Sequence, residues 1–129
     1  MKVTEASLRL ILDRWKPRLG LDCRWHIETR MYTDATWPKK WRGSVAFAEP
    51  SPGYFSATMH LNTEAMERDG DTAEHIVLHE LVHIPLWRLS IIARDSLGDK
   101  QEALWRDLME EATETITRAL LAKNAAASK

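Results

Sequence analysis

The sequence has a single cysteine, Cys23, no long apolar run and no clear excess of charge of either sign. One thiol cannot form an internal disulfide, which favours an intracellular, cytoplasmic protein. No apolar stretch approaches the roughly 18 residues that a membrane-spanning helix requires, and the early Glu5 argues against a signal peptide. We therefore expect no membrane partner.

Positive and negative side chains almost cancel, since 18 Lys and Arg stand against 19 Asp and Glu for a formal net charge of −1. Nucleic-acid-binding proteins normally carry a basic excess or a basic stripe, so the balance argues against a nucleic-acid partner. The segment 37–42 (WPKKWR) does alternate aromatic and basic residues, as single-strand-binding surfaces do. It keeps nucleic-acid binding open as a third interpretation.

The composition is that of one globular domain. An apolar fraction of 44% and a charged fraction of 29% are ordinary for a folded protein. A chain of 129 residues suits a single domain spanning 1–129. The six tryptophans are interpreted mainly as core anchors, because each offers a large area for burial.

Hydrophobic periodicity predicts an α+β fold. Apolar residues at helical spacing predict a helix capped by Thr4 and stopped by Pro17, a second helix over about 71–84 that Pro85 ends or kinks, and a third over about 99–123. Alternating apolar and polar residues predict strands over 21–31, 44–49 and 54–62. We expect a small, mainly antiparallel three-stranded sheet covered on one side by the helices.

The second helix carries the most informative motif, His79-Glu80-Leu81-Val82-His83. Histidines four residues apart lie on one face of a helix, where both imidazoles can reach a single ion. A catalytic zinc ion takes three protein ligands and leaves one position for water. Glu80 could then act as general base toward that water. The motif therefore predicts His79 and His83 as zinc ligands and Glu80 as a catalytic residue.

The alternative interpretation is a pair of core histidines held by hydrogen bonds without a metal. Most of the remaining circumference of this helix is Ile, Val and Leu, so a His-Glu-His stripe is hard to explain by solvation alone. Buried polar groups without partners would each cost about 1–3 kcal/mol. His75 lies about 12 Å along the helix from His83, too far to share its ion, and is expected to be a surface residue.

The motif and its apolar flanks resemble the zincin metallopeptidases. The sequence has Leu86 and Leu89 where the metzincin pattern has its glycine and its third histidine, and the aspzincin pattern G-T-x-D is absent. The chain is therefore similar to the gluzincin type, whose third zinc ligand is a Glu on a later helix, often followed by Ala.

The last predicted helix offers Glu110, Glu111 and Ala112 in succession. Glu111 followed by Ala112 matches the gluzincin pattern, so the resemblance implies that Glu111 completes a zinc site with the two histidines. Glu111 also lies nearer than Glu110 to the expected apolar stripe of this helix, formed by Leu104, Leu108, Ala112 and Ile116. The remaining alternatives for the third ligand are Glu110, Glu114 and Glu102.

The order of elements looks like that of minimal gluzincin-like domains in small phage and prophage metallopeptidases, and is similar to SprT-type and ImmA-type proteases. The resemblance implies a zinc-dependent endopeptidase with one zinc ion per chain and a protein or peptide substrate. It also implies that the strand 54–62 is the sheet edge lining the cleft, with Thr58 and His60 beside it. The alternative function is a non-catalytic zinc-binding regulatory or interaction module; Glu80 weighs against it, because a structural site needs no base.

Overall fold

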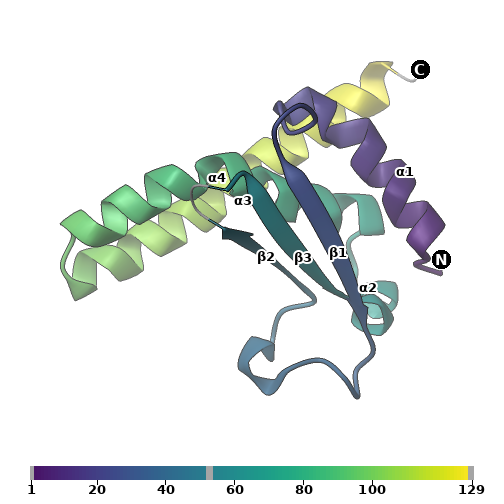
Figure 1. Ribbon diagram of the computed structural model, residues 1–129, viewed down its shortest axis with the longest axis horizontal. Helices are drawn as coiled ribbons and strands as arrows, with labels where there is room; N and C mark the ends of the chain where they lie inside the picture. Colours follow the sequence, from purple (N-terminus) through teal and green to yellow (C-terminus); the bar gives the residue numbers. More distant parts are fainter. Residues whose placement is uncertain (1, 52–53, 128–129) are drawn as a thin grey trace.

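The computed structural model describes residues 2–51 and 54–127, apart from the side chains of Arg88, Arg94 and Asp99. The helices and strands are α1 (Glu5–Trp15), β1 (His26–Tyr32), β2 (Ala46–Ser51), β3 (Ser56–Asn62), α2 (Thr63–Arg68), α3 (Ala73–Ser96) and α4 (Asp99–Ala127), with short 3-10 turns at Pro17–Leu19 and Lys39–Trp41. The α+β fold is confirmed, and α2 is the one helix that periodicity did not predict. Figure 1 shows the strands as one layer in front of α3 and α4.

The sheet is mixed rather than mainly antiparallel. Its strand order is β1-β3-β2, with β3 parallel to β1 and antiparallel to β2. Because β3 inserts between the two earlier strands, it pairs with β1, which runs in the same direction. The expectation that the strand 54–62 forms a sheet edge is therefore wrong, since both edges of β3 are occupied and β2 is an edge strand.

The core lies between the sheet and the helices. Thr4 and Ser7 form a capping box that starts α1, and α1 packs on α3 through buried Leu8 and Trp15. The largest group of buried side chains belongs to α3, where six apolar residues are between 0% and 7% exposed: Ile76, Val77, Leu78, Leu81, Val82 and Ile84. Within the described residues, no helix combines the length and apolar character needed to cross a bilayer.

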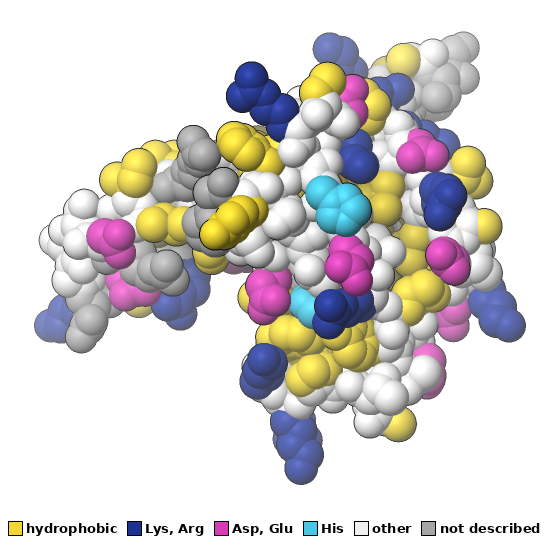
Figure 2. Space-filling model, viewed as in Figure 1, with side chains coloured by type: hydrophobic (Ala, Val, Ile, Leu, Met, Phe, Trp, Pro, Cys, Tyr) yellow, Lys and Arg dark blue, Asp and Glu magenta, His cyan; other side chains and the backbone are white. Residues whose placement is uncertain are grey.

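The second face of the sheet is covered by the loop 33–43. Trp41 packs on His60 with ring centroids 4.5 Å apart, and the Tyr32 hydroxyl lies 2.8 Å from His60 Nδ1. His60 is consequently only 5% exposed, although sequence alternation places it on the polar side of its strand. Trp37 also packs against Tyr32 and Trp41, so the WPKKWR segment contributes its tryptophans to this aromatic cluster. Figure 2 shows basic side chains scattered over this face among acidic ones.

Pro85 does not end helix α3. Helix α3 continues through it to Ser96, although Pro85 has no N–H to donate to the carbonyl of Leu81. The loss of one hydrogen bond is offset by packing, because the part of α3 beyond Pro85 pairs with α4 in a helical hairpin. In Figure 1 the tip of this hairpin projects beyond the sheet.

Helix α4 buries a different face from the one expected. Leu104, Leu108 and Ile116 of the predicted apolar stripe are 60%, 50% and 39% exposed, whereas Thr113 and Thr117 are fully buried. Each threonine hydroxyl donates to the helix itself, at Met109 O for Thr113 and Thr113 O for Thr117. With the hydroxyl satisfied locally, the methyl group packs as an apolar group, and the buried face is rotated by one residue relative to the prediction.

This helix phase predicts unequal effects of the same substitution. Leu108→Ala should change the free energy of unfolding by less than about 0.5 kcal/mol, as surface substitutions usually do. Leu81→Ala should lower it by about 2–5 kcal/mol, because it leaves a cavity in the core. Urea unfolding of both variants measures the difference, and equal losses would show that α4 buries Leu108.

The buried His60 predicts a pH-dependent stability. Burial lowers the pKa of His60, so the folded chain binds a proton there less readily than the unfolded chain does. The free energy of unfolding therefore keeps its full value above the ordinary histidine pKa of about 6.5. It decreases as the pH falls below that value, because the unfolded chain then binds a proton that the folded chain does not. His60→Phe should therefore reduce the loss of stability between about pH 7.5 and pH 5.5, measured by urea unfolding. His26→Phe, at an exposed position of β1, is the control and should leave that loss unchanged.

Candidate metal centre

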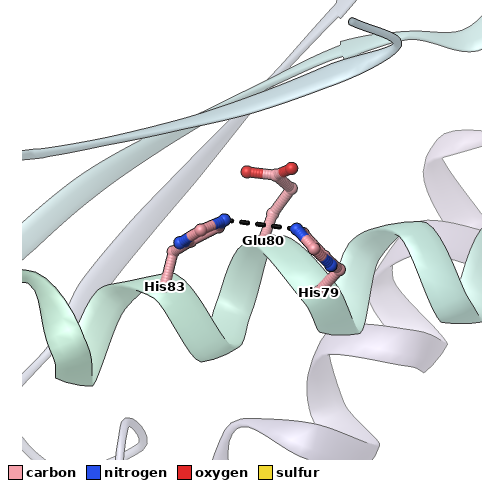
Figure 3. Close-up of side chains that lie close together, drawn as sticks. All are labelled: His79, Glu80 and His83. Carbon is pink, nitrogen blue, oxygen red and sulfur yellow. Dashed lines mark hydrogen bonds between the residues drawn. The ribbon is translucent and has the colours of Figure 1, made fainter. Parts of the chain in front are cut away.

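Helix α3 brings together the three residues of the motif. His79 and His83 lie on successive turns, and Figure 3 shows their rings turned toward each other while Glu80 points toward the neighbouring strand. The two Nε2 atoms are 3.2 Å apart. The apolar side chains that surround the motif are buried, so the orientation of the helix leaves the imidazoles on the one face that is open to a cleft.

Helix α4 contributes a carboxylate to the same point. Glu110 places Oε2 3.2 Å from His79 Nε2 and Oε1 2.8 Å from His83 Nε2. The hydrogen bonds with the two histidines lower the pKa of Glu110 far below its ordinary value. The same contact with Glu110 raises the pKa of His79.

The donor set fits a zinc ion. Ligand atoms about 2.0–2.1 Å from a tetrahedral ion are roughly 3.3 Å apart, close to the 2.8–3.2 Å that separate the two imidazole nitrogens and the Glu110 oxygens. Two imidazole nitrogens that lie 3.2 Å apart, each in contact with one oxygen of the same carboxylate, are also a chemically suitable set of ligands. Without an ion, protons must lie between these atoms; a divalent cation would satisfy all three groups at once.

Glu111 does not lie at this site, contrary to the expectation from the gluzincin pattern. Its side chain is exposed on α4, one residue and about 100° away from Glu110, which faces the histidines. The error follows from the helix phase: with Thr113 buried, Glu110 lies on the side toward α3. Glu102 lies two turns before Glu110, and Glu114 lies one turn after it. The signal that could have identified Glu110 is the spacing of four residues that joins Trp105, Met109, Thr113 and Thr117 into one face of the helix.

Glu80 lies on the other side of the same opening, against strand β2. Its Oε2 accepts a hydrogen bond from the Ala48 N–H at 3.0 Å, and Oε1 has no hydrogen-bond partner among the described residues. Burial raises the pKa of Glu80 to about 6. A carboxylate with one oxygen held in place and the other available is suited to receiving a proton.

A second set of polar side chains contacts His79 at Nδ1, the ring nitrogen that does not face Glu110. Glu114 Oε1 lies 3.4 Å from His79 Nδ1 and 2.6 Å from His75 Nε2. Burial opposes ionisation of Glu114, but its contacts with the two histidines outweigh this effect and lower its pKa. His75 also lies 3.6 Å from Asp71 through Nδ1, so it is part of a polar network rather than a free surface residue. A carboxylate behind an imidazole is the usual outer contact of a metal-binding histidine.

A cleft of about 460 Å³ runs between β2 and the α3–α4 hairpin. Ala46 and Ala48 line it on the strand side, and Glu80, His83 and Glu110 line it on the helix side. The polar residues of β3 that were expected beside the cleft lie elsewhere. Thr58 and His60 are on the opposite face of the sheet from buried Met59, because side chains alternate along a strand.

Comparisons of the chain with protein-family models, with curated proteins and with solved structures found no match. The interpretation of the site therefore depends on the residues and distances described above.

The geometry predicts which glutamate binds the metal. The purified chain should hold about one zinc ion, and Glu110→Ala should weaken its binding by more than the roughly 10–100-fold that loss of an outer contact produces. Glu111→Ala is the matched control and should leave zinc binding nearly unchanged. Zinc affinity is measured by competition with a chromophoric chelator, and chelation should lower the melting temperature of the parent chain. The reverse ranking of the two variants would restore Glu111 as the ligand.

Proposed function

We propose that this chain is a zinc-dependent endopeptidase that hydrolyses peptide bonds in protein or peptide substrates. The observation that carries the proposal is the convergence of His79, His83 and Glu110 on one point, with Glu80 beside them at the same cleft. These groups come from two helices that are packed on each other, so their relative position is fixed by the fold.

His79, His83 and Glu110 would hold the zinc ion. When bound, zinc supplies Lewis-acid chemistry and lowers the pKa of a coordinated water toward about 7. Glu80 receives the proton of the attacking water at Oε1, while its Oε2 stays bonded to the Ala48 N–H. Glu114 holds the ring of His79 through Nδ1. The chain thus provides a metal-binding group, a base and an outer contact that orients a ligand.

The peptide substrate lies along the free edge of β2. The pairing of Val45 O with Asn62 N, and the register of β2 with β3, direct the main-chain groups of Ala46 and Ala48 away from β3. Because the Ala48 N–H already donates to Glu80, a substrate strand would pair with the N–H and carbonyl of Ala46 and with the carbonyl of Ala48. An extended peptide can add to such an edge through main-chain hydrogen bonds, as in other cases of strand addition. Because Ala46, Ala48, Glu80 and Glu110 line one cleft, a peptide on this edge would pass beside the proposed metal site.

The donor set also bears on the non-catalytic alternative. A structural zinc site usually has four protein ligands, whereas a catalytic one has three. Among the described residues, Glu110 contacts the ring nitrogens of His79 and His83, and Glu80 also has a carboxylate oxygen within 4.8 Å of a ring nitrogen of each histidine. With Glu80 assigned as the base, three ligands remain, and this number favours the catalytic interpretation over a purely structural one.

The single cysteine supports a location in a reducing compartment. Cys23 is a free thiol and is exposed. Exposed thiols persist where glutathione and thioredoxin keep them reduced, so we propose a cytoplasmic location.

The proposal predicts that Glu80 can be separated from the metal ligands. Glu80→Gln keeps the size of the side chain and both histidines, so zinc content should persist while hydrolysis falls by roughly 10²–10⁴-fold. The measurement is digestion of a mixture of unfolded proteins, followed by mass spectrometry, with metal content determined on the same sample.

Glu64→Gln, at an exposed position of α2, is the control and should digest the mixture like the parent. If Glu80→Gln keeps activity within a few-fold of the parent, Glu80 is not the base. If the zinc-loaded parent cleaves nothing in the mixture, the proposed activity is wrong.

A further inference from the structure

A second group of side chains suited to a metal ion lies next to the proposed zinc site. Asp71 precedes α3, His75 lies in the first turn of α3, and Glu114 belongs to α4. Each residue offers one ligand atom, and the three atoms all lie within 4.8 Å of one another. Atoms bound to one divalent cation at about 2.0–2.4 Å can be up to roughly 4–4.8 Å apart, so a single ion can reach all three residues.

The imidazole of His75 connects the two carboxylates. Its Nε2 lies 2.6 Å from Glu114 Oε1, and its Nδ1 lies 3.6 Å from Asp71 Oδ1. The side chain of His75 is 14% exposed, whereas those of Glu114 and Asp71 are 32% and 50% exposed. An ion can therefore enter from solvent, and it would displace the proton from one ring nitrogen of His75, because a metal-bound histidine is neutral.

The cavity around this group carries an excess of negative charge. It has a volume of about 240 Å³, and five carboxylates line it, those of Asp69, Asp71, Glu80, Glu110 and Glu114. Among the described residues, no Lys or Arg lines this cavity. One divalent cation at the proposed zinc site offsets two of the five charges. Because carboxylates held close together repel one another, a second cation would stabilise the three that remain.

Basic side chains outside the cavity offset little of this charge. Arg118 Nε lies 3.6 Å from Glu114 Oε2, but the side chain of Arg118 is 69% exposed, so solvent and salt weaken the ion pair. The described ion pairs of Asp71 include no Lys or Arg; its partner is His75. The negative charge of Asp71 and part of that of Glu114 are therefore left for a cation.

We propose that Asp71, His75 and Glu114 form a second metal site, which binds a divalent transition-metal cation. One imidazole and two carboxylates are nitrogen and oxygen ligands that both Zn²⁺ and Mn²⁺ accept. The imidazole distinguishes this group from a purely acidic cluster, whose oxygen ligands would suit Ca²⁺ or Mg²⁺. The site is separate from the proposed zinc site, because Glu114 contacts Nδ1 of His79 whereas Glu110 contacts Nε2. It has no part in the proposed hydrolysis.

A cation at this site would link two segments that are far apart in the sequence. Asp71 lies in the connection between α2 and α3, directly before Thr72, the N-cap of α3. Glu114 lies in the middle of α4. Binding to the folded chain alone stabilises it by mass action, so occupancy of the second site should raise the melting temperature.

Binding of Mn²⁺ tests the second site without any hydrolysis. The chain is loaded with one equivalent of Zn²⁺, which nitrogen and oxygen sites bind more tightly than Mn²⁺, and is then titrated with Mn²⁺. The electron paramagnetic resonance signal of free Mn²⁺ measures how much is bound, and NMR follows the broadening of the histidine ring signals. We expect about one bound Mn²⁺ per chain and the strongest broadening at His75.

Two results of this titration would overturn the inference. Absence of bound Mn²⁺ would show that the three side chains form a hydrogen-bonded network without a metal. Strongest broadening at His83 would place the Mn²⁺ ion at the first site.

Two matched variants separate a ligand from general negative charge. Asp71→Asn removes a ligand and should weaken Mn²⁺ binding by more than about tenfold. Asp69→Asn removes the same charge from the same cavity, but Asp69 is not one of the three grouped ligands, so the affinity should stay within a few-fold of the parent. Equal losses in the two variants would show that the cavity attracts the ion without a defined site, which contradicts the inference.

His75→Ala tests the imidazole itself. The variant should lose the bound Mn²⁺ and the rise in melting temperature that Mn²⁺ causes in the parent, while it keeps one equivalent of Zn²⁺. His26→Ala, at an exposed position of β1, is the control and should keep both. Binding of Mn²⁺ by His75→Ala as in the parent would overturn the inference, and so would loss of Zn²⁺ together with Mn²⁺. If His75→Ala does not fold, the comparison of Asp71→Asn with Asp69→Asn decides the question.

Discussion

Burial of helix α3 on most of its circumference is the constraint on which the rest of the structure depends. Its apolar side chains between Ile76 and Ile84 are almost fully buried, and the helix contacts α1, β2 and α4. Rotating α3 would expose several of these side chains, and each would lose about 1.5–3 kcal/mol of burial free energy. The histidines and Glu80 therefore stay on the one face that opens to the cleft.

The order of the strands in the sheet decides that β2 lies beside the His79–His83 motif of α3. With β3 in the centre of the sheet, β2 becomes the edge strand next to α3, and the bond from the Ala48 N–H to Glu80 joins the strand to the helix. The edge that could bind an extended peptide and the carboxylate that could activate water are therefore positioned by one contact. A sheet with β3 at its edge would have placed His60 in a different environment from the aromatic cluster with Tyr32 and Trp41 that it now joins.

The α3–α4 hairpin combines apolar packing with contacts between imidazoles and carboxylates. Glu110 and Glu114 on α4 contact His75, His79 and His83 on α3, so the two helices are held together at the proposed metal site. Farther along the hairpin, an apolar cavity of about 190 Å³ is lined by Trp87, Ile91, Trp105 and Met109. One helix pair thus provides the metal ligands and, directly beside them, an apolar recess.

The sequence by itself determined the features that depend on local spacing. These are the α+β class, the capping of α1 by Thr4, and the pairing of His79 with His83 on one helix face, since periodicity and hydrogen bonds to near neighbours fix them. Tertiary structure alone decided the mixed strand order, the continuation of α3 through Pro85, and the fact that Glu110 rather than Glu111 contacts the two histidines. The clearest case is the choice of which face of α4 is buried. The Thr113 hydroxyl donates a hydrogen bond to a carbonyl of its own helix, so the residue packs like an apolar one, while the leucines of the predicted stripe remain exposed. Which face of an amphipathic helix is buried depends on the surface that it meets, and that surface exists only after α3 and the sheet have formed.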